Sequence, residues 1–219
     1  MRPAARARIK RIKQIMGEGA DTGPLRAMRA RVRGLGVTRW LRHKHHGDRY
    51  GIVRGLIAGR GRNVLDVGCG PPCETMADGA FLRSLGYGRG VDAEARSIPF
   101  PFVQGDVEAI PFRSGAFDAV TCIEVIEHVH HPHAALDELA RVVRDDGVVV
   151  LTTPDNHLVF QAIWFLWERL GGGIWAHTHV YSLNKRGWLR LLREHGRFTV
   201  TFLKRYWGIN LIMRLEKKN

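Results

Sequence analysis

Short apolar stretches alternate with amphipathic stretches from residue 63 to the end of the chain. Strand-like runs occupy 63–67, 89–92, 102–103, 118–123 and 148–152, and two more follow at 198–206 and 210–215. Helical spacing of apolar positions is found at 74–85, 133–143 and 183–195. Strands that alternate with helices are typical of a parallel sheet with helices on both faces. We therefore predict an α/β fold with a mostly parallel, seven-stranded sheet that ends in an antiparallel strand pair.

Positive charge is concentrated ahead of this pattern. Residues 1–60 hold 16 of the 34 Lys and Arg but only 3 of the 21 Asp and Glu, so they carry a formal charge of +13 and the remainder is balanced. Apolar residues recur at helical spacing among these charges, at Ile9, Ile12, Ile15 and Met16. A basic amphipathic helix fits anionic membrane lipid or nucleic acid. We predict a basic arm over residues 1–47 and one domain over residues 48–219.

The sequence predicts a cytoplasmic protein that touches membranes at most peripherally. No apolar run reaches the roughly 18 residues that span a bilayer. The N-terminal residues lack the apolar stretch of a secretory signal. Three cysteines, Cys69, Cys73 and Cys122, give no even disulfide framework.

The stretch VLDVGCGPP, residues 64–72, joins the first strand to the first helix of the domain. Gly68 and Gly70 allow a ligand to approach the backbone closely, with the N-terminus of a helix behind it. Asp92 ends the next strand, where a carboxylate can accept hydrogen bonds from both hydroxyls of a ribose. Because Cys73 breaks the G-x-G-x-x-G pattern of dinucleotide enzymes, we predict a nucleoside ligand without a pyrophosphate.

Five segments in this order resemble the class I S-adenosylmethionine-dependent methyltransferases: VLDVGCGPP, GVDAE, QGDVEAIPF, FDAVTCIEVIEHV and LARVVRDDGVVVLTTPD. The resemblance covers about residues 48–217 and implies a Rossmann-like fold and S-adenosylmethionine as cofactor. It places the two glycines under the methionine part, Asp92 on the ribose, Asp106 on the adenine amino group and Val107 on the ring. The full set that it implies for cofactor binding is Asp66, Gly68, Cys69, Gly70, Asp92, Ala93, Asp106, Val107, Ile123 and Glu124.

Two departures from the family pattern change the expectation. Pro72 stands where many relatives have a third glycine, which predicts a stiffer loop. Only 14 positions separate Asp92 from Asp106, so little room is left for the usual second helix. We expect the adenine side of the site to be more open than usual.

The segment EVIEHV has two interpretations. Glu124, Glu127 and His128 would share one face if a helix began here. In the first interpretation Glu127 and His128 are catalytic, with His128 as the acid–base residue. In the second, Glu124, Glu127, His128 and His179 (rather than His177) hold a divalent metal. That set locally resembles the enzymes that methylate the 3′-terminal ribose of small RNAs and, in part, the ubiquinone-pathway O-methyltransferases.

The remaining histidines and Cys69 have simpler interpretations. We predict that His43, His45 and His46 lie on the surface and that the histidines at 130, 131 and 133 lie in a solvated loop. Cys69 is predicted to be a small buried residue of the turn.

Aromatic side chains cluster at Val159–Trp167, after the fifth strand, where relatives build a cover over the substrate. Together with the basic arm, this segment favours O-methylation of a small apolar or lipid-linked acceptor. Two alternatives stay open: a metal-dependent ribose 2′-O-methyltransferase that uses the arm to bind RNA phosphates, and a non-catalytic adaptor that binds the cofactor.

Overall fold

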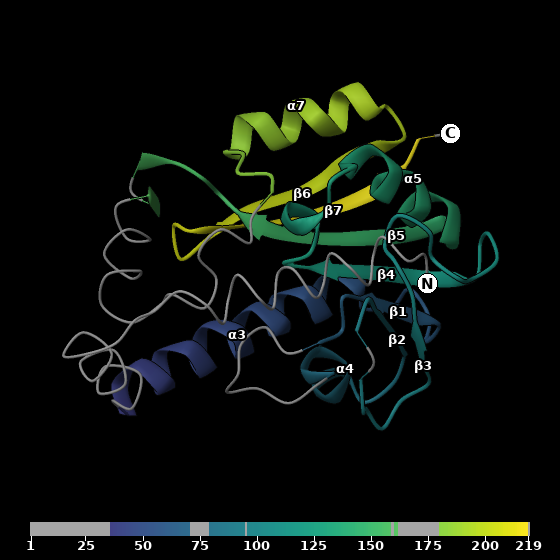
Figure 1. Cartoon of the computed structure of the whole chain (residues 1–219), viewed down its shortest axis with the longest axis horizontal. Helices are drawn as coiled ribbons and strands as arrows, with labels where there is room; N and C mark the ends of the chain where they lie inside the picture. The colour runs from purple at the N-terminus through teal and green to yellow at the C-terminus, as the bar shows by residue number, and fades with distance from the viewer. Residues whose placement is uncertain (1–35, 71–78, 95, 159, 162–179, 219) are drawn as a thin grey trace, which may run out of the picture.

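The computed structural model describes residues 36–70, 79–94, 96–158, 160–161 and 180–218 (Figure 1). Most of the basic arm lies outside the described residues, as do the start of the predicted helix 74–85, most of the aromatic segment, His177 and His179. The same holds for Pro72 and Cys73.

The sheet has seven strands in the order β3-β2-β1-β4-β5-β7-β6. Strands β1 to β5 pair in parallel, whereas β7 is antiparallel to both β5 and β6. Their bounds are β1 Val64–Val67, β2 Arg89–Asp92, β3 Phe102–Gln104, β4 Phe117–Ile123, β5 Val143–Pro154, β6 Phe198–Tyr206 and β7 Asn210–Lys217. The predicted α/β fold and its antiparallel terminal pair are confirmed.

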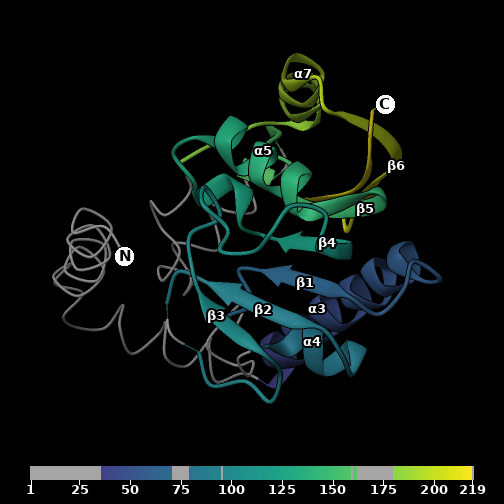
Figure 2. The same ribbon diagram turned by 90° about the vertical axis from the view of Figure 1, so that its right-hand side faces the viewer.

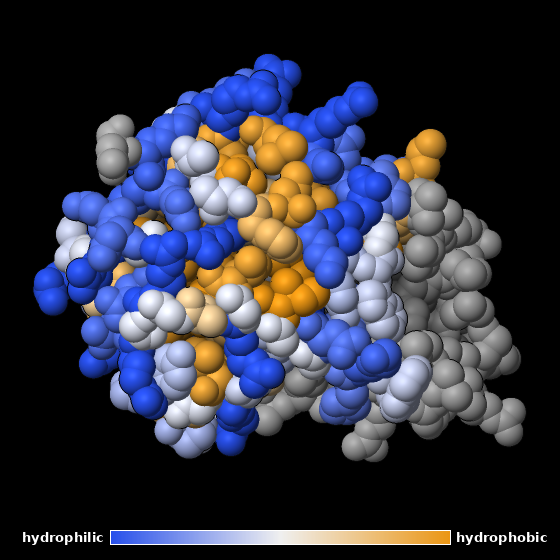
Figure 3. All heavy atoms as spheres, turned by 180° about the vertical axis from the view of Figure 1, so that it is seen from behind, coloured by the Kyte–Doolittle hydropathy of each residue, from blue (hydrophilic) through white to orange (hydrophobic). Residues whose placement is uncertain are grey.

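Helices cover both faces of this sheet. On one face lie α3 (Gly36–Ile57) and α4 (Ala80–Leu85), and on the other lie α5 (Pro132–Val142) and α7 (Lys185–His195) (Figure 2). Each face has its own buried apolar cluster: Tyr50, Val53 and Phe81 belong to the first, and Leu136 and Trp188 to the second. From behind, hydrophobic side chains gather over the middle of the molecule with hydrophilic ones around them (Figure 3).

The largest difference from the predicted strands is at β5, which begins at Val143 rather than 148. The segment RDDG looks like a turn by composition, yet it continues the strand because Val143 pairs with Phe117 across a register shift in β4. Between β2 and β3, the described residues 93–94 and 96–101 contain no helix. The short connection predicted from the Asp92–Asp106 spacing is therefore confirmed.

Helix α3 runs through the boundary predicted between residues 47 and 48. Its second half is part of the core, since Val53 and Ile57 are buried against the sheet. The described part of the predicted arm, residues 36–47, is therefore continuous in one helix with residues 48–57 of the predicted domain.

Candidate active site

The carboxyl end of β1 carries a buried acid. Asp66 is almost inaccessible to solvent, and the Thr121 hydroxyl of β4 donates a 2.7 Å hydrogen bond to its Oδ1. Burial raises the pKa of Asp66 to about 7, and the nearby Asp92 carboxylate adds to the increase. Asp66 is therefore only partly ionised at neutral pH.

The turn after β1 requires glycine at residue 68 for a reason that the sequence did not reveal. Gly68 has φ of 72°, and its N–H donates a 2.7 Å hydrogen bond to the Val91 carbonyl. A Cβ at this position would collide with the Val125 side chain. Packing of the turn against the segment after β4 thus demands glycine independently of any ligand.

Gly70 and Asp92 are brought together, as predicted. The Gly70 N–H donates to Asp92 Oδ2 at 2.9 Å, and the Glu94 N–H donates to Oδ1 at 2.9 Å. The Arg96 guanidinium lies 3.3 Å from Oδ1. A Cβ at Gly70 would stand 2.8 Å from that guanidinium and 2.9 Å from Asp92 Oδ2. Sequence reasoning missed Arg96, which lies in the short connection that replaces the usual helix.

The other predicted cofactor residues lie at or shortly after the carboxyl ends of β2, β3 and β4. Asp106 is exposed after β3, and its Oδ1 accepts a 2.9 Å hydrogen bond from the Glu108 N–H. Val107 is half-buried against the larger apolar cluster, and Ile123 ends β4. The Ala93 carbonyl accepts from the Gln104 side chain.

Cys69 is buried in the turn, as predicted, where its Sγ leaves no room for a Cβ at Gly90. Burial raises the pKa of its thiol to about 12, so the thiol is neutral.

Glu124 is held in an unusual backbone conformation by donors from three elements. Its φ is 55°, in the left-handed region. Its Oε1 accepts from the Thr152 hydroxyl at 2.8 Å and lies 3.2 Å from Arg49 Nη1, while Oε2 accepts from the Asn210 side-chain amide at 2.8 Å. Arg49, from α3, is only 1% exposed.

His43 is exposed, as predicted, whereas His45 and His46 are only partly exposed and contact the residues around Glu124. Arg49 Nη2 lies 2.8 Å from Nδ1 of His46, and His45 Nε2 lies 3.1 Å from Asn210 Oδ1. Burial and the nearby Arg49 charge lower the pKa of His45 to about 4, so His45 is neutral. Sequence reasoning missed Arg49, because it is one of many arginines in a basic region.

Glu127 and His128 lie in a short 3-10 helix, η1 (Ile126–His128), which Glu124 precedes. Glu124 therefore lies outside this helix, and the condition for a helical face shared by all three residues is not met. Glu127 is buried, and within the described residues neither of its carboxyl oxygens has a hydrogen-bond partner. Burial, followed by the Glu124 carboxylate, raises the pKa of Glu127 well above its usual range. His128 is partly exposed, with Nε2 at 4.0 Å from Glu127 Oε1.

Residues 45–201 match a family described as a methyltransferase domain, and this match covers most of the chain. The chain belongs to this methyltransferase family. The cofactor of such enzymes suits the site, because Asp92 at the end of β2 is a carboxylate suited to a ribose, and the backbone of the Gly70 turn lies directly against it. The described residues therefore fit S-adenosylmethionine.

Curated relatives of this methyltransferase include two whose names refer to quinones. The ubiquinone biosynthesis O-methyltransferase of Paracidovorax citrulli is 34% identical over 125 residues, 51% of each chain. The demethylmenaquinone methyltransferase of Mycobacterium bovis is 35% identical over 113 residues, 49% of this chain and 48% of its own. The chain thus spans about half the length of these relatives.

Solved structures share the fold of this methyltransferase at low identity. Geranyl diphosphate C-methyltransferase from Streptomyces coelicolor superposes with a TM-score of 0.61 at 14% identity, covering 80% of each chain. The YcgJ protein of Bacillus subtilis has a TM-score of 0.58 at 16% identity, covering 80% of this chain and all of its own.

A divalent metal does not fit the described part of the EVIEHV site. In the described ranges, no three His, Cys, Asp or Glu side chains are grouped so that they could hold a metal ion. The Glu124 carboxylate already has Arg49, Thr152 and Asn210 as partners, and burial favours the uncharged form of Glu127. His179, the fourth predicted ligand, lies outside the described residues.

Proposed function

We propose that this protein transfers a methyl group from S-adenosylmethionine to an oxygen atom of a small, apolar or lipid-linked acceptor. The observation that carries the proposal is the hydrogen-bonded contact between the Gly70 turn and Asp92 at the carboxyl ends of β1 and β2. It occurs in a chain of the methyltransferase family. Ligands of open α/β sheets bind outside these strand ends.

The cofactor would supply an electrophilic methyl group, and residues of the chain would hold the cofactor in position for methyl transfer. Asp92 would hold the ribose hydroxyls, Asp106 and Val107 would receive the adenine, and the turn at residues 68–70 would border the methionine part. Displacement at a methyl carbon needs the donor, methyl and acceptor atoms in line, so rigid placement contributes most of the rate enhancement. The 22-residue helix α3 adds to this rigidity, because Arg49 fixes the Glu124 carboxylate beside the site.

His128 is the candidate general base. Its imidazole is partly exposed next to the buried Glu127, just after the carboxyl end of β4. It would receive the proton that the acceptor hydroxyl loses as the new oxygen–carbon bond forms. Glu127 fixes the position of the loop behind it, because its backbone carbonyl accepts hydrogen bonds from the N–H groups of Val180 and Tyr181 at 2.8 and 2.9 Å.

Three features support an apolar, membrane-associated acceptor. The names of the relatives reported above refer to ubiquinone biosynthesis and to demethylmenaquinone. Large apolar side chains are exposed at Trp40, Leu158 and Trp207, and tryptophan favours the membrane interface. The +13 charge of residues 1–60 is suited to anionic lipid. No helix in the described ranges has the length and apolar character to cross a bilayer, so we propose peripheral contact.

A label-transfer assay tests this function. The protein is incubated with methyl-labelled S-adenosylmethionine and three separated cell fractions: lipids in anionic vesicles, water-soluble metabolites and RNA. We expect label in the lipid fraction. His128→Ala should reduce turnover by about 100-fold or more while cofactor affinity stays the same, because only proton transfer is lost. Label in RNA would favour the ribose methyltransferase, and cofactor binding without transfer to any fraction would favour the adaptor.

A further inference from the structure

The carboxylate proposed to bind the ribose already has a cationic partner within the chain. Asp92 Oδ1 lies 3.3 Å from Arg96 Nη2, and the same nitrogen lies 3.4 Å from Glu94 Oε2. The pair is shielded, since the Asp92 side chain is 11% exposed and that of Arg96 is 20% exposed.

The remaining hydrogen-bonding capacity of Asp92 is too small for a ribose. An ionised carboxylate offers about four acceptor positions. The N–H groups of Gly70 and Glu94 and the Arg96 guanidinium occupy three of them. Two ribose hydroxyls need two acceptor positions, so one existing donor has to leave. The backbone donors are fixed by the turn and sit at 2.9 Å, whereas Arg96 is a side chain at 3.3 Å.

The position of the guanidinium leads to the same conclusion. A Cβ built on Gly70 would stand 2.8 Å from both Cζ and Nη2 of Arg96. The space beside the Gly70 backbone is therefore occupied by the Arg96 side chain. A ligand that approaches the Gly70 backbone meets the Arg96 side chain first.

We propose that Arg96 competes with the cofactor ribose for Asp92, and so is a residue that sets cofactor affinity. This inference rests on the proposed function, because it needs the cofactor at Asp92. The ion pair stabilises the cofactor-free site, and binding exchanges it for two ribose hydrogen bonds while the guanidinium keeps Glu94 as its partner. The cost of breaking the pair is subtracted from the affinity.

Calorimetric titration of the full chain with S-adenosylhomocysteine tests the exchange. Arg96→Met keeps the length of the side chain and removes its charge, and we expect Kd to fall about two- to fivefold, the range of a partly exposed ion pair. Arg96→Lys should lie between Arg96→Met and wild type. Affinity of the wild type should rise with salt, which screens the pair, more than that of Arg96→Met. Arg89→Met is the matched control, because it removes the same charge from the exposed opposite end of β2.

Unchanged or weaker binding in Arg96→Met, with a melting temperature equal to that of the wild type, would overturn the proposal. Weaker binding would mean that the arginine itself holds the cofactor. Asp92→Asn separates this failure from that of the proposed function. If Asp92→Asn binds as tightly as the wild type, the ribose is not at Asp92 and the cofactor assignment is wrong. If it binds more weakly while Arg96→Met is unchanged, the cofactor assignment stands and only the competition fails.

Discussion

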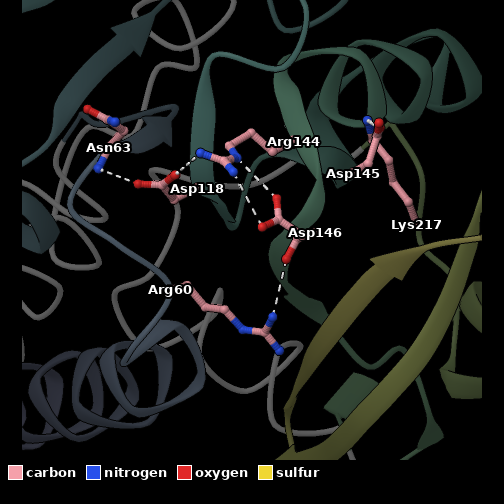
Figure 4. A network of polar contacts seen from close by, with 7 residues as sticks. All are labelled: Arg60, Asn63, Asp118, Arg144, Asp145, Asp146 and Lys217. Carbon is pink, nitrogen blue, oxygen red and sulfur yellow. Dashed lines mark hydrogen bonds and ion pairs between the residues drawn. The ribbon is translucent and has the colours of Figure 1, made fainter.

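Opposite ends of the parallel strands carry polar networks of similar composition and very different surroundings. The amino ends hold Arg60, Asn63, Asp118, Arg144, Asp145, Asp146 and Lys217 (Figure 4). Arg144 bridges Asp118 and Asp146, and its side chain is 51% exposed. At the carboxyl ends, the buried Arg49 forms an ion pair with the Glu124 carboxylate, which also accepts a hydrogen bond from the Asn210 side-chain amide. Arg144 and Arg49 are the central arginines of the two networks, and of these two only Arg49 is removed from water.

Exposure to water decides how strongly each network holds its residues in place. Exposed ion pairs contribute roughly 0–1 kcal/mol, because water and salt replace the partners. In a buried pair each charge depends on its partner, so the geometry is held tightly. The carboxyl-end network is therefore able to keep Glu124 at its left-handed φ beside the active site, whereas the amino-end network only joins strand ends at the surface.

Removal of the buried arginine should have the largest effect. Arg49→Met leaves the Glu124 carboxylate without its cation, and we expect unfolding free energy to fall by roughly 3–5 kcal/mol. Guanidinium unfolding followed by circular dichroism measures this. Adding Glu124→Gln should recover part of the loss, because the uncompensated charge is then gone. A loss below about 1 kcal/mol would remove the distinction between the two networks.

The sequence predicted the sheet better than the site, and particular residues show why. Strands such as 89–92 and 198–206 were predicted with their observed bounds, because alternation of apolar stretches is a local signal. Gly70 and Asp92 lie together because neighbouring parallel strands place their carboxyl ends at one edge, and their binding of the cofactor stays a prediction.

Contacts between distant segments could not be predicted in the same way. Arg49 and Asn210 are 161 residues apart, and both contact the Glu124 carboxylate. No periodicity in the sequence indicates that these residues lie together. The conformation of Glu124 was equally hidden, because a Glu with positive φ is uncommon and EVIEHV looks helical.

The buried carboxyl of Asp66, at the carboxyl end of β1, should make the stability of the protein depend on pH. The pKa of Asp66 rises by burial to about 7 in the fold, against 3.8 for the free group, so the folded state binds more protons between these values. Stability should then fall as pH rises toward 7 and level off above it. Relative to Asp66→Asn, the wild type should lose roughly 2–3 kcal/mol of unfolding free energy between pH 5 and 8.

Urea unfolding at several pH values checks this expectation. Asp146→Asn, from the exposed network, is the control. Arg144 lowers the pKa of Asp146 through a hydrogen bond, so its contribution runs in the opposite direction, present at neutral pH and lost in acid. Parallel stability curves for the wild type and Asp66→Asn would show that Asp66 is ionised in the fold.

The smallest effect is expected at the exposed arginine. In Arg144→Met, Asp118 keeps the 3.0 Å hydrogen bond from the Asn63 N–H, and Asp146 remains hydrated at the surface. We therefore expect a loss below about 1 kcal/mol that largely disappears in 1 M salt, since screening already weakens the pair in the wild type. Guanidinium carries its own ionic strength, so urea with and without sodium chloride is the proper measurement. A salt-independent loss above 2 kcal/mol would show that Asp118, whose side chain is 12% exposed, behaves as a buried charge and that the amino-end network resembles the one around Glu124.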